Sequence, residues 1–466
     1  AKALSPLTHA MATADQLRAA LDADDCDRLL QLCRQLDSNL TVRTASYEGP
    51  VVHQVARKPY GLDCLKLLVR KFGTACLSKS RDEHGFLAVH LAAQYQSAAS
   101  MEFIYSCLGP ACLKLRGYHG RTIVHTAALN PHSNSALKWL VQKAGPACLR
   151  VEASGGSTPA HLSAMIQGCD SLQFIKEQLG SGCFKQRCEF GRTVVHEAAM
   201  NLSSNSAFRW LVSECGSDSL METDKQGCTP VHLAAFRQGS DSMQFIKEQL
   251  GPDVFMLKGL SEDTSVHCAA RNVISNSAFD WCVKELGAEC LLAKNAFGET
   301  PVHQAAQHQD EKSMQLAVSS LGPKCLTLAS DKQRTAAHFA AINCRSSSAL
   351  RWIVGQLGPD CLQLRDTDGS LALHLAARHQ DVDSLRLIKE TLGVAAFGLT
   401  NRSGQTVAHY AAANSKKKQL MDWLLSEVGP QCLVLPDSNG RTAAEMAGYS
   451  LAKTGDPAGY CLAIDR

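Results

Sequence analysis

Apolar positions along the chain fall into pairs of helix-length segments, and these pairs recur throughout the sequence. The first segment of a pair is short and rich in Ala and Val, as in residues 229–235 (TPVHLAA). The second segment is longer, with apolar residues three and four positions apart, as in residues 242–250 (SMQFIKEQL). This spacing is typical of amphipathic helices, so each pair predicts a helix–turn–helix unit.

A glycine follows the second segment of every full pair. These glycines are Gly73, Gly109, Gly145, Gly180, Gly216, Gly251, Gly287, Gly322, Gly358, Gly393 and Gly429. Since glycine adopts positive φ without strain, we expect each one to end its helix in a left-handed conformation. A Cys-Leu-x-Leu type segment then leads to the next pair, and we expect it to form one arm of a hairpin-like finger.

The phrase Gly-x-Thr-x-x-His-x-Ala-Ala marks the start of each pair. Its histidines are His53, His90, His125, His161, His196, His232, His267, His303, His338, His374 and His409. After a first interval of 37 residues, the intervals alternate between 35 and 36, and a twelfth copy has Glu445 in place of the histidine. Self-similarity at this period predicts a solenoid. We expect the threonine of the phrase to cap the short helix.

The repeats divide the chain into three predicted parts. Residues 1–48 carry two polar helical segments, 13–21 and 25–33, which suit an N-terminal cap. Residues 49–438 hold eleven full repeats, and residues 439–466 hold a C-terminal capping repeat and a tail.

The phrase, the Leu/Ile-rich second segment and the closing glycine together resemble the ankyrin repeat over about residues 45–450. The resemblance implies an all-α ankyrin-repeat solenoid, with a helix-turn-helix and a hairpin-like finger in each repeat. It also implies that the histidine bonds to backbone of its own and the neighbouring repeat. Two departures from the usual ankyrin repeat recur along the chain. The repeats are two or three residues longer than is usual, and the glycine that closes the first helix is replaced.

Two kinds of repeat alternate, which gives a unit of 71 residues. One kind carries all five tryptophans of the chain, Trp139, Trp210, Trp281, Trp352 and Trp423. The same kind has asparagine five residues after its histidine, at Asn130, Asn201, Asn272, Asn343 and Asn414. The other kind has glutamine six residues after its histidine, at Gln96, Gln167, Gln238, Gln309 and Gln380.

We expect the tryptophans to act as core wedges between repeats, because they share a helical register with flanking Leu, Val and Ile. Asparagine tolerates the left-handed conformation and is therefore expected to replace the missing helix-ending glycine. Both amide rows are interpreted as loop-closing residues. A repeating polar contact with an extended partner remains the alternative.

The sequence offers little catalytic or cofactor chemistry. His196-Glu197 begins like a HExxH zinc motif but has Met200 where the second histidine must stand. Glycine-rich phosphate loops, a GxSxG elbow and CxxC pairs are missing from the sequence. We therefore expect no enzyme activity, catalytic residue, metal, cofactor or small-molecule substrate.

Charge and cysteine usage narrow the expected partners and compartment. The formal net charge of +3 is nearly balanced for 466 residues, which disfavours nucleic acid binding except through a larger assembly. The sequence contains no apolar run that predicts membrane insertion. Twenty cysteines, eight of them at one repeat register, are interpreted as small buried thiols in a reducing intracellular compartment, either cytoplasm or an organellar matrix.

The main functional hypothesis is a non-catalytic scaffold or adaptor for protein–protein interaction. By the resemblance, partners dock on the finger tips and the exposed face of the first helix, which line a concave surface. Candidate residues at the tips are Tyr118, His119, Phe190, Lys225, Phe297, Lys332 and Arg402. Candidates on the first-helix side are Tyr95, Phe236, Arg237, His308, Arg378 and His379. The alternatives are an architectural accessory subunit of a large multiprotein or ribonucleoprotein assembly, organellar or not, and, with less support, direct RNA binding.

Overall fold

The computed structural model describes residues 15–35, 41–43, 48–453 and 460–464. The chain divides into two compact units, Ala1–Pro230 and Val231–Arg466, which are described separately. Parts of the predicted caps, residues 1–14, 36–40, 44–47, 454–459 and 465–466, lie outside the described residues. The predicted three-part division at residues 48 and 438 stays a prediction.

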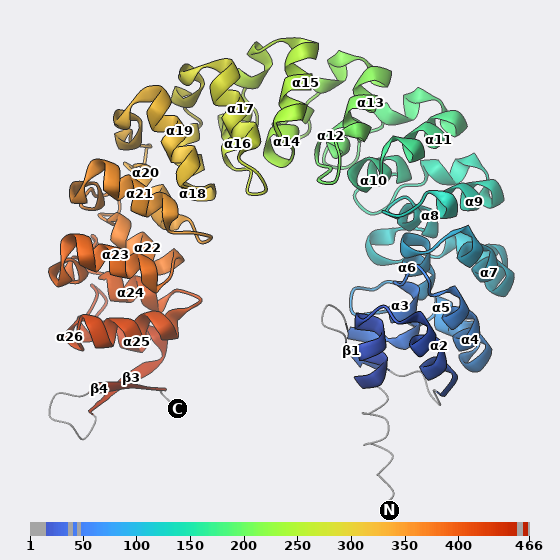
Figure 1. Cartoon of the computed structure of the whole chain (residues 1–466), viewed down its shortest axis with the longest axis horizontal. Helices are drawn as coiled ribbons and strands as arrows, with labels where there is room; N and C mark the ends of the chain where they lie inside the picture. Colours follow the sequence, from blue (N-terminus) through green and yellow to red (C-terminus); the bar gives the residue numbers. More distant parts are fainter. Residues whose placement is uncertain (1–14, 36–40, 44–47, 454–459, 465–466) are drawn as a thin grey trace, which may run out of the picture. The chain divides into compact units, whose positions relative to one another are not determined.

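In the first unit, each repeat has a short first helix and a longer second helix (Figure 1). The first helices are α3 (Val51–Ala56), α6 (Ala88–Tyr95), α8 (Ile123–Ala127), α10 (Pro159–Ile166) and α12 (Val194–Ala199). The second helices are α4 (Leu62–Phe72), α7 (Ala98–Leu108), α9 (Ser135–Ala144), α11 (Cys169–Leu179) and α13 (Ser206–Cys215). A helix over residues 15–22 and α2 (Cys26–Gln35) precede them, as predicted for the N-terminal region.

The second unit follows the same plan. Its first helices are α14 (Pro230–Arg237), α16 (Ser265–Ala270), α18 (Pro301–His308), α20 (Ala336–Ile342), α22 (Ala372–His379), α24 (Val407–Ala412) and α27 (Ala443–Ala447). Its second helices are α15 (Ser240–Leu250), α17 (Ser277–Leu286), α19 (Glu311–Leu321), α21 (Ser348–Leu357), α23 (Val382–Leu392) and α25 (Lys417–Glu427). The predicted all-α helix–turn–helix repeats are thus confirmed.

Two small antiparallel hairpins were not predicted. In the first unit β1 (Thr41–Arg43) pairs with β2 (Glu48–Pro50), and in the second β3 (Tyr449–Lys453) pairs with β4 (Tyr460–Ile464). They lie near the ends of the chain, beyond the regular repeats (Figure 1). Their sequences lack the repeating phrase, so the periodicity carried no information about them.

Within each unit the first helices pack in one row and the second helices in another. Consecutive first helices contact each other, as α10 and α12 do, and so do consecutive second helices such as α17 and α19. Alanines such as Ala198 and Ala199 are fully buried between first helices, where their small side chains permit close approach. Larger side chains, including Phe208 and Phe279, fill the space between the rows.

The finger joins each second helix to the next first helix, and it differs from the prediction at its start. Each Cys-Leu-x-Leu type segment forms a short helical turn instead of an extended arm. These turns are α5 (Ala75–Ser78), η1 (Gly109–Lys114), η3 (Pro146–Arg150), η4 (Ser181–Lys185), η5 (Ser217–Leu220), η6 (Asp253–Met256), η8 (Ala288–Leu292), η9 (Pro323–Thr327), η10 (Pro359–Leu362), η11 (Val394–Gly398) and α26 (Gln431–Val434). Two fingers carry a further turn at the tip, η2 (Tyr118–Gly120) and η7 (Leu260–Glu262).

The glycine before each turn explains this geometry. Gly216, for example, has φ 87° and ψ 156°, so φ is positive as expected but ψ is extended. This combination is essentially restricted to glycine, and it turns the chain sharply out of the helix into the next turn. The predicted left-handed helical conformation is therefore wrong in ψ.

Candidate protein-interaction surface

In most repeats a buried histidine connects the first helix to the finger of the next repeat. The Thr193 N–H and hydroxyl both donate to Nδ1 of His196, at 3.1 and 2.9 Å. The opposite nitrogen, Nε2, therefore carries the proton and donates to the Cys228 carbonyl at 3.3 Å. Thr264 and His267 repeat this arrangement. The implied bond between the histidine and the neighbouring repeat is confirmed.

Burial keeps these histidines neutral. Removal from solvent lowers the pKa of His196 to about 4, although the nearby Asp224 carboxylate opposes the shift. Burial lowers the pKa values of His125 and His303 to about 4 in the same way. In the described part of the chain, no three His, Cys, Asp or Glu side chains are grouped to hold a metal ion.

The asparagine and glutamine rows form a second connection on the opposite edge of the repeats, where a loop joins first helix to second helix. We call this side the loop edge. Asn201 Nδ2 donates to the Ala164 and Gln167 carbonyls of the preceding repeat, each at 3.1 Å. Gln167 Nε2 donates in turn to the Asn130 carbonyl at 2.6 Å. Asn272, Gln309, Asn343, Gln380 and Asn414 continue this ladder in the second unit.

The ladder corrects the predicted role of the asparagines. None of the five has positive φ, and Asn343 leaves α20 at φ −63° and ψ 101°. Each asparagine instead closes its own loop with Oδ1, as Asn201 does by accepting the N–H groups of Ser203 and Ser204. The amide groups of both rows are buried against this chain's own backbone. Contact with an extended partner would therefore require other groups.

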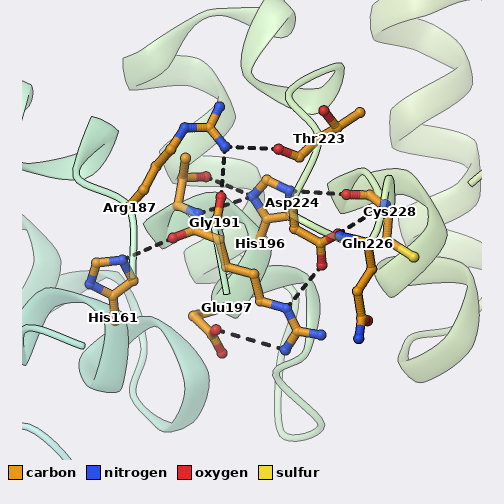
Figure 2. A network of polar contacts seen from close by, with 11 residues as sticks. His161, Arg187, Gly191, His196, Glu197, Thr223, Asp224, Gln226 and Cys228 are labelled. Carbon is orange, nitrogen blue, oxygen red and sulfur yellow. Dashed lines mark hydrogen bonds and ion pairs between the residues drawn. The ribbon is translucent and has the colours of Figure 1, made fainter. Parts of the chain in front are cut away.

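On the finger edge, the side that carries the finger tips, Asp224 organises one finger (Figure 2). Its Oδ1 accepts the N–H groups of Gln226 and Cys228 at 2.9 and 3.0 Å, which shapes the turn. Its Oδ2 accepts from Arg192 Nε at 3.2 Å. Arg192 also lies 4.0 Å from Glu197, and burial raises the pKa of that carboxyl although the guanidinium opposes the shift.

Arginines at one recurring position, missed in the sequence, fasten some of the fingers to the next. Arg187 Nη1 donates to the Gly191 carbonyl at 2.6 Å and to the Thr223 carbonyl of the next repeat at 2.8 Å (Figure 2). Arg116 and Arg365 make the equivalent pair of bonds. The signal is an arginine four residues before the finger glycine, which recurs without belonging to the main phrase.

Backbone bonds also run from tip to tip. The Lys225 N–H donates to the Phe190 carbonyl at 2.9 Å, and the Asp331 N–H donates to the Phe297 carbonyl at 3.0 Å. The Arg402 N–H reaches the tip of the preceding repeat in the same way. Neighbouring tips therefore hold a fixed spacing, and their side chains project from a preorganised row.

The predicted tip residues are all exposed. Phe190 is 63% exposed, Phe297 53% and Tyr118 41%, which is unusual for large apolar side chains. The remaining tip candidates, His119, Lys225, Lys332 and Arg402, are exposed as well. The tips thus combine aromatic and basic side chains in the manner of an interface.

The predicted first-helix residues divide into two groups. Arg378 and His379 at the end of α22 are exposed. The others are half-buried, namely Tyr95, Phe236, Arg237 and His308. Burial and the neighbouring guanidinium groups of Arg271 and Arg345 lower the pKa of His308 to about 4, so its ring is neutral at physiological pH.

The tryptophans lie in the second helices and reach the core only in part. Trp281 and Trp423 are 9% exposed, whereas Trp139, Trp210 and Trp352 are half-buried. Trp281 packs on Phe255, with ring centroids 5.1 Å apart, and Lys247 Nζ lies 5.9 Å from its ring. The tryptophan rings thus pack between neighbouring helices and turns, as predicted, but part of each side chain stays exposed to solvent.

The recurring cysteines are mostly buried, as predicted. Six are buried and two, Cys148 and Cys183, are half-buried. Burial raises the pKa of Cys325 and Cys361 to about 11, so these thiols stay protonated at neutral pH.

Residues 338–435 match a family model described as ankyrin repeats (3 copies). The match covers three repeats of the second unit, from the phrase histidine of α20 to the turn after α25. No curated protein matches the chain. No helix within the described residues is long and apolar enough to cross a membrane.

Proposed function

Because this chain belongs to the ankyrin-repeat family, we propose that it is a non-catalytic scaffold or adaptor that binds a protein partner through its finger tips. Ankyrin repeats form protein–protein interaction domains. The observation that carries the proposal is the exposed aromatic and basic tip residues of each unit, above all Phe190 in the first and Phe297 in the second. Tip-to-tip backbone bonds hold these residues in register within their own unit. Fixed spacing lowers the entropy lost on binding.

The C-terminal ends of the first helices offer further groups in each unit, next to the loop edge. Exposed Arg378 and His379, together with half-buried Tyr95 and Phe236, supply polar and apolar groups there. Arginine and aromatic side chains are frequent anchors of interfaces.

An architectural role in a large assembly is the second candidate, because exposed apolar side chains are not confined to the tips. Leu202 and Ile274 on the loop edge are 60% and 55% exposed, and Val434 in the turn after α25 is 51% exposed. A subunit that contacts several neighbours needs such groups on several faces. Direct RNA binding has less support, since finger arginines such as Arg187 and Arg365 are engaged in bonds within the chain.

Fractionation of native extract by size tests the proposal. The wild-type chain is expected to co-migrate with a stoichiometric protein partner. The variant carrying Phe190→Ala and Phe297→Ala is expected to bind that partner about 30-fold more weakly or worse, as for aromatic hot spots. A control carrying Ile274→Ala and Val434→Ala removes side chains of similar exposure elsewhere and should keep the partner.

Loss of the partner by the control alone would contradict binding through the tips. Migration of the wild-type chain with a particle many times its size, with both double variants weakened, would favour the architectural role.

A further inference from the structure

The 71-residue alternation produces notches on the loop edge. The loops of asparagine repeats are longer than those of glutamine repeats, so a recessed loop lies between two projecting ones. One cavity, of about 550 Å³, lies over Gln167–Asp170 and between the loops that carry Pro131 and Ser203. A second cavity, of about 190 Å³, lies over His308–Asp310 and between the loops that carry Val273 and Arg345.

The two notches are built from equivalent positions. Pro131 corresponds to Val273 and Ser203 to Arg345, each 142 residues apart, which is two 71-residue units. Each notch lies within a single unit of the chain. Differences between them therefore reflect the side chains that line them.

The chain itself supplies an arginine to the smaller notch. Arg345 Nη1 crosses from one wall and donates to the Val273 carbonyl on the other, at 2.9 Å. A third repeat pair behaves similarly, because Lys416, equivalent to Arg345, lies 3.9 Å from Asp381 on the recessed loop. Two of these repeat pairs thus place a basic side chain of the chain itself against acceptors on the loop edge.

The larger notch keeps the equivalent backbone acceptor, the Pro131 carbonyl, but no Lys or Arg lines it. Its recessed loop has Gly168 where the other two pairs have Asp310 and Asp381. Ser203 replaces the arginine, and within the described residues no hydrogen bond reaches the Pro131 carbonyl. Asp170, in the first turn of α11, instead supplies an exposed carboxylate at this notch. It pairs with no Lys or Arg of the described chain and accepts only a long bond from the Cys169 thiol at 3.8 Å. Carboxylate and carbonyl oxygens suit a guanidinium, which only donates.

We propose that the notch between Pro131 and Ser203 binds an arginine side chain projecting from a protein partner, in the place that Arg345 fills in the equivalent notch. The inference rests on the proposed function, because it assumes a protein partner. It adds a specific anchor on the loop edge, away from the finger tips. The guanidinium donates to the Pro131 carbonyl and pairs with Asp170.

Titration of the full chain with N-acetyl-arginine amide tests the site without needing the partner. Ile166 lines the notch, so its methyl NMR signal should shift and saturate as the probe binds. N-acetyl-citrulline amide, which has the same shape without the charge, should cause no saturable shift. Asp170→Asn should weaken binding of the arginine probe about tenfold, the usual scale for losing one charged hydrogen-bond partner.

Two reciprocal variants sharpen the test. Ser203→Arg should fill the larger notch from within, so that Ile166 no longer responds to the probe. Arg345→Ser should open the smaller notch, so that the Val273 methyl signals, silent in the wild-type chain, begin to respond. A folded chain in both cases is shown by unchanged methyl signals in the other unit.

The proposal is overturned if Ile166 does not respond to the arginine probe, responds equally to the citrulline probe, or still responds in Ser203→Arg. These outcomes leave the finger-tip proposal untouched. Conversely, a response at Ile166 with no effect of the Phe190 and Phe297 substitutions on the partner would retain the notch and refute the tips.

Discussion

The finger edge and the loop edge connect the same repeats with different chemistry. On the finger edge, Asp224 pairs with Arg192, and neutral His196 donates to the next finger. On the loop edge, Asn201 and Gln167 use only uncharged amides and backbone carbonyls. Both hydrogen-bond networks are buried, yet only the finger-edge network, with Asp224 and His196, includes groups that titrate.

The two edges therefore differ in how their contribution to the free energy of unfolding depends on pH. Amide bonds to backbone are insensitive to pH and salt, so the loop edge sets a constant spacing between repeats. Histidine and carboxylate contacts depend on protonation, so the finger edge responds to acid. The exposed tip residues lie on the edge that responds.

The largest expected effect is acid destabilisation of the finger edge. The pKa values of buried His196 and His303 are about 4 when folded, against about 6.5 when unfolded. Their stabilising contribution is therefore complete above pH 6.5 and is lost as the pH falls toward 4, at about 1.4 kcal/mol per pH unit for each histidine. Urea unfolding followed by circular dichroism from pH 8 to pH 5 should show a steep fall over several repeats.

A pair of substitutions isolates one histidine. His196→Gln should lower by about one the number of protons that the chain takes up on unfolding between pH 6.5 and pH 4. The substitution His132→Gln, at an exposed position, should leave that number unchanged. A pH dependence equal in the two variants would contradict the assignment of acid sensitivity to the finger edge.

The next effect is loss of one step of the loop-edge ladder. Asn272→Ala leaves the Ala235 and Gln238 carbonyls without the side-chain donor and the Ile274 and Ser275 N–H groups without their acceptor. Buried unpaired groups of this kind cost about 1–3 kcal/mol each when water does not reach them, so we expect a loss of about 3–5 kcal/mol. Equilibrium urea unfolding at pH 7.5 measures it.

Asn439→Ala is the control, since this tip residue is exposed and its backbone N–H makes its bond. It should change stability by less than about 0.5 kcal/mol. If Asn272→Ala were as mild as the control, the ladder would not hold the repeats together.

The smallest expected effect concerns Asp224. It distinguishes the stability that comes from the ion pair with Arg192 from the stability that comes from the hydrogen bonds that shape the turn. Asp224→Ala removes both the turn acceptor and the ion pair, for a loss of about 3 kcal/mol. Asp224→Asn keeps an oxygen for the Gln226 and Cys228 N–H groups and loses only the charge next to Arg192, so it should cost about half as much. Exposed Asp218→Ala serves as the control in the same urea experiment. Equal losses for the two Asp224 variants would show that the ion pair alone stabilises this finger.

The sequence by itself determined the repeat, its two helices and its alternation. The phrase histidines, the alanine-rich first segments and the helix-ending glycines all recur within one repeat of about 35 residues. They depend on local sequence, so the pattern predicts them directly. It also located exposed tip residues such as Phe190 and Phe297, since finger positions repeat in fixed register.

Only the tertiary structure decided what the recurrent polar residues contact. Asn201 was expected to end its helix in a left-handed conformation, but its amide reaches acceptors 34 and 37 residues earlier in the chain. Arg345 reaches a carbonyl 72 residues away, across an intervening repeat. Such partners depend on how closely and in what register the repeats stack, because a hydrogen bond tolerates only a few tenths of an ångström. Periodicity shows that a position recurs, whereas packing decides which atom it meets.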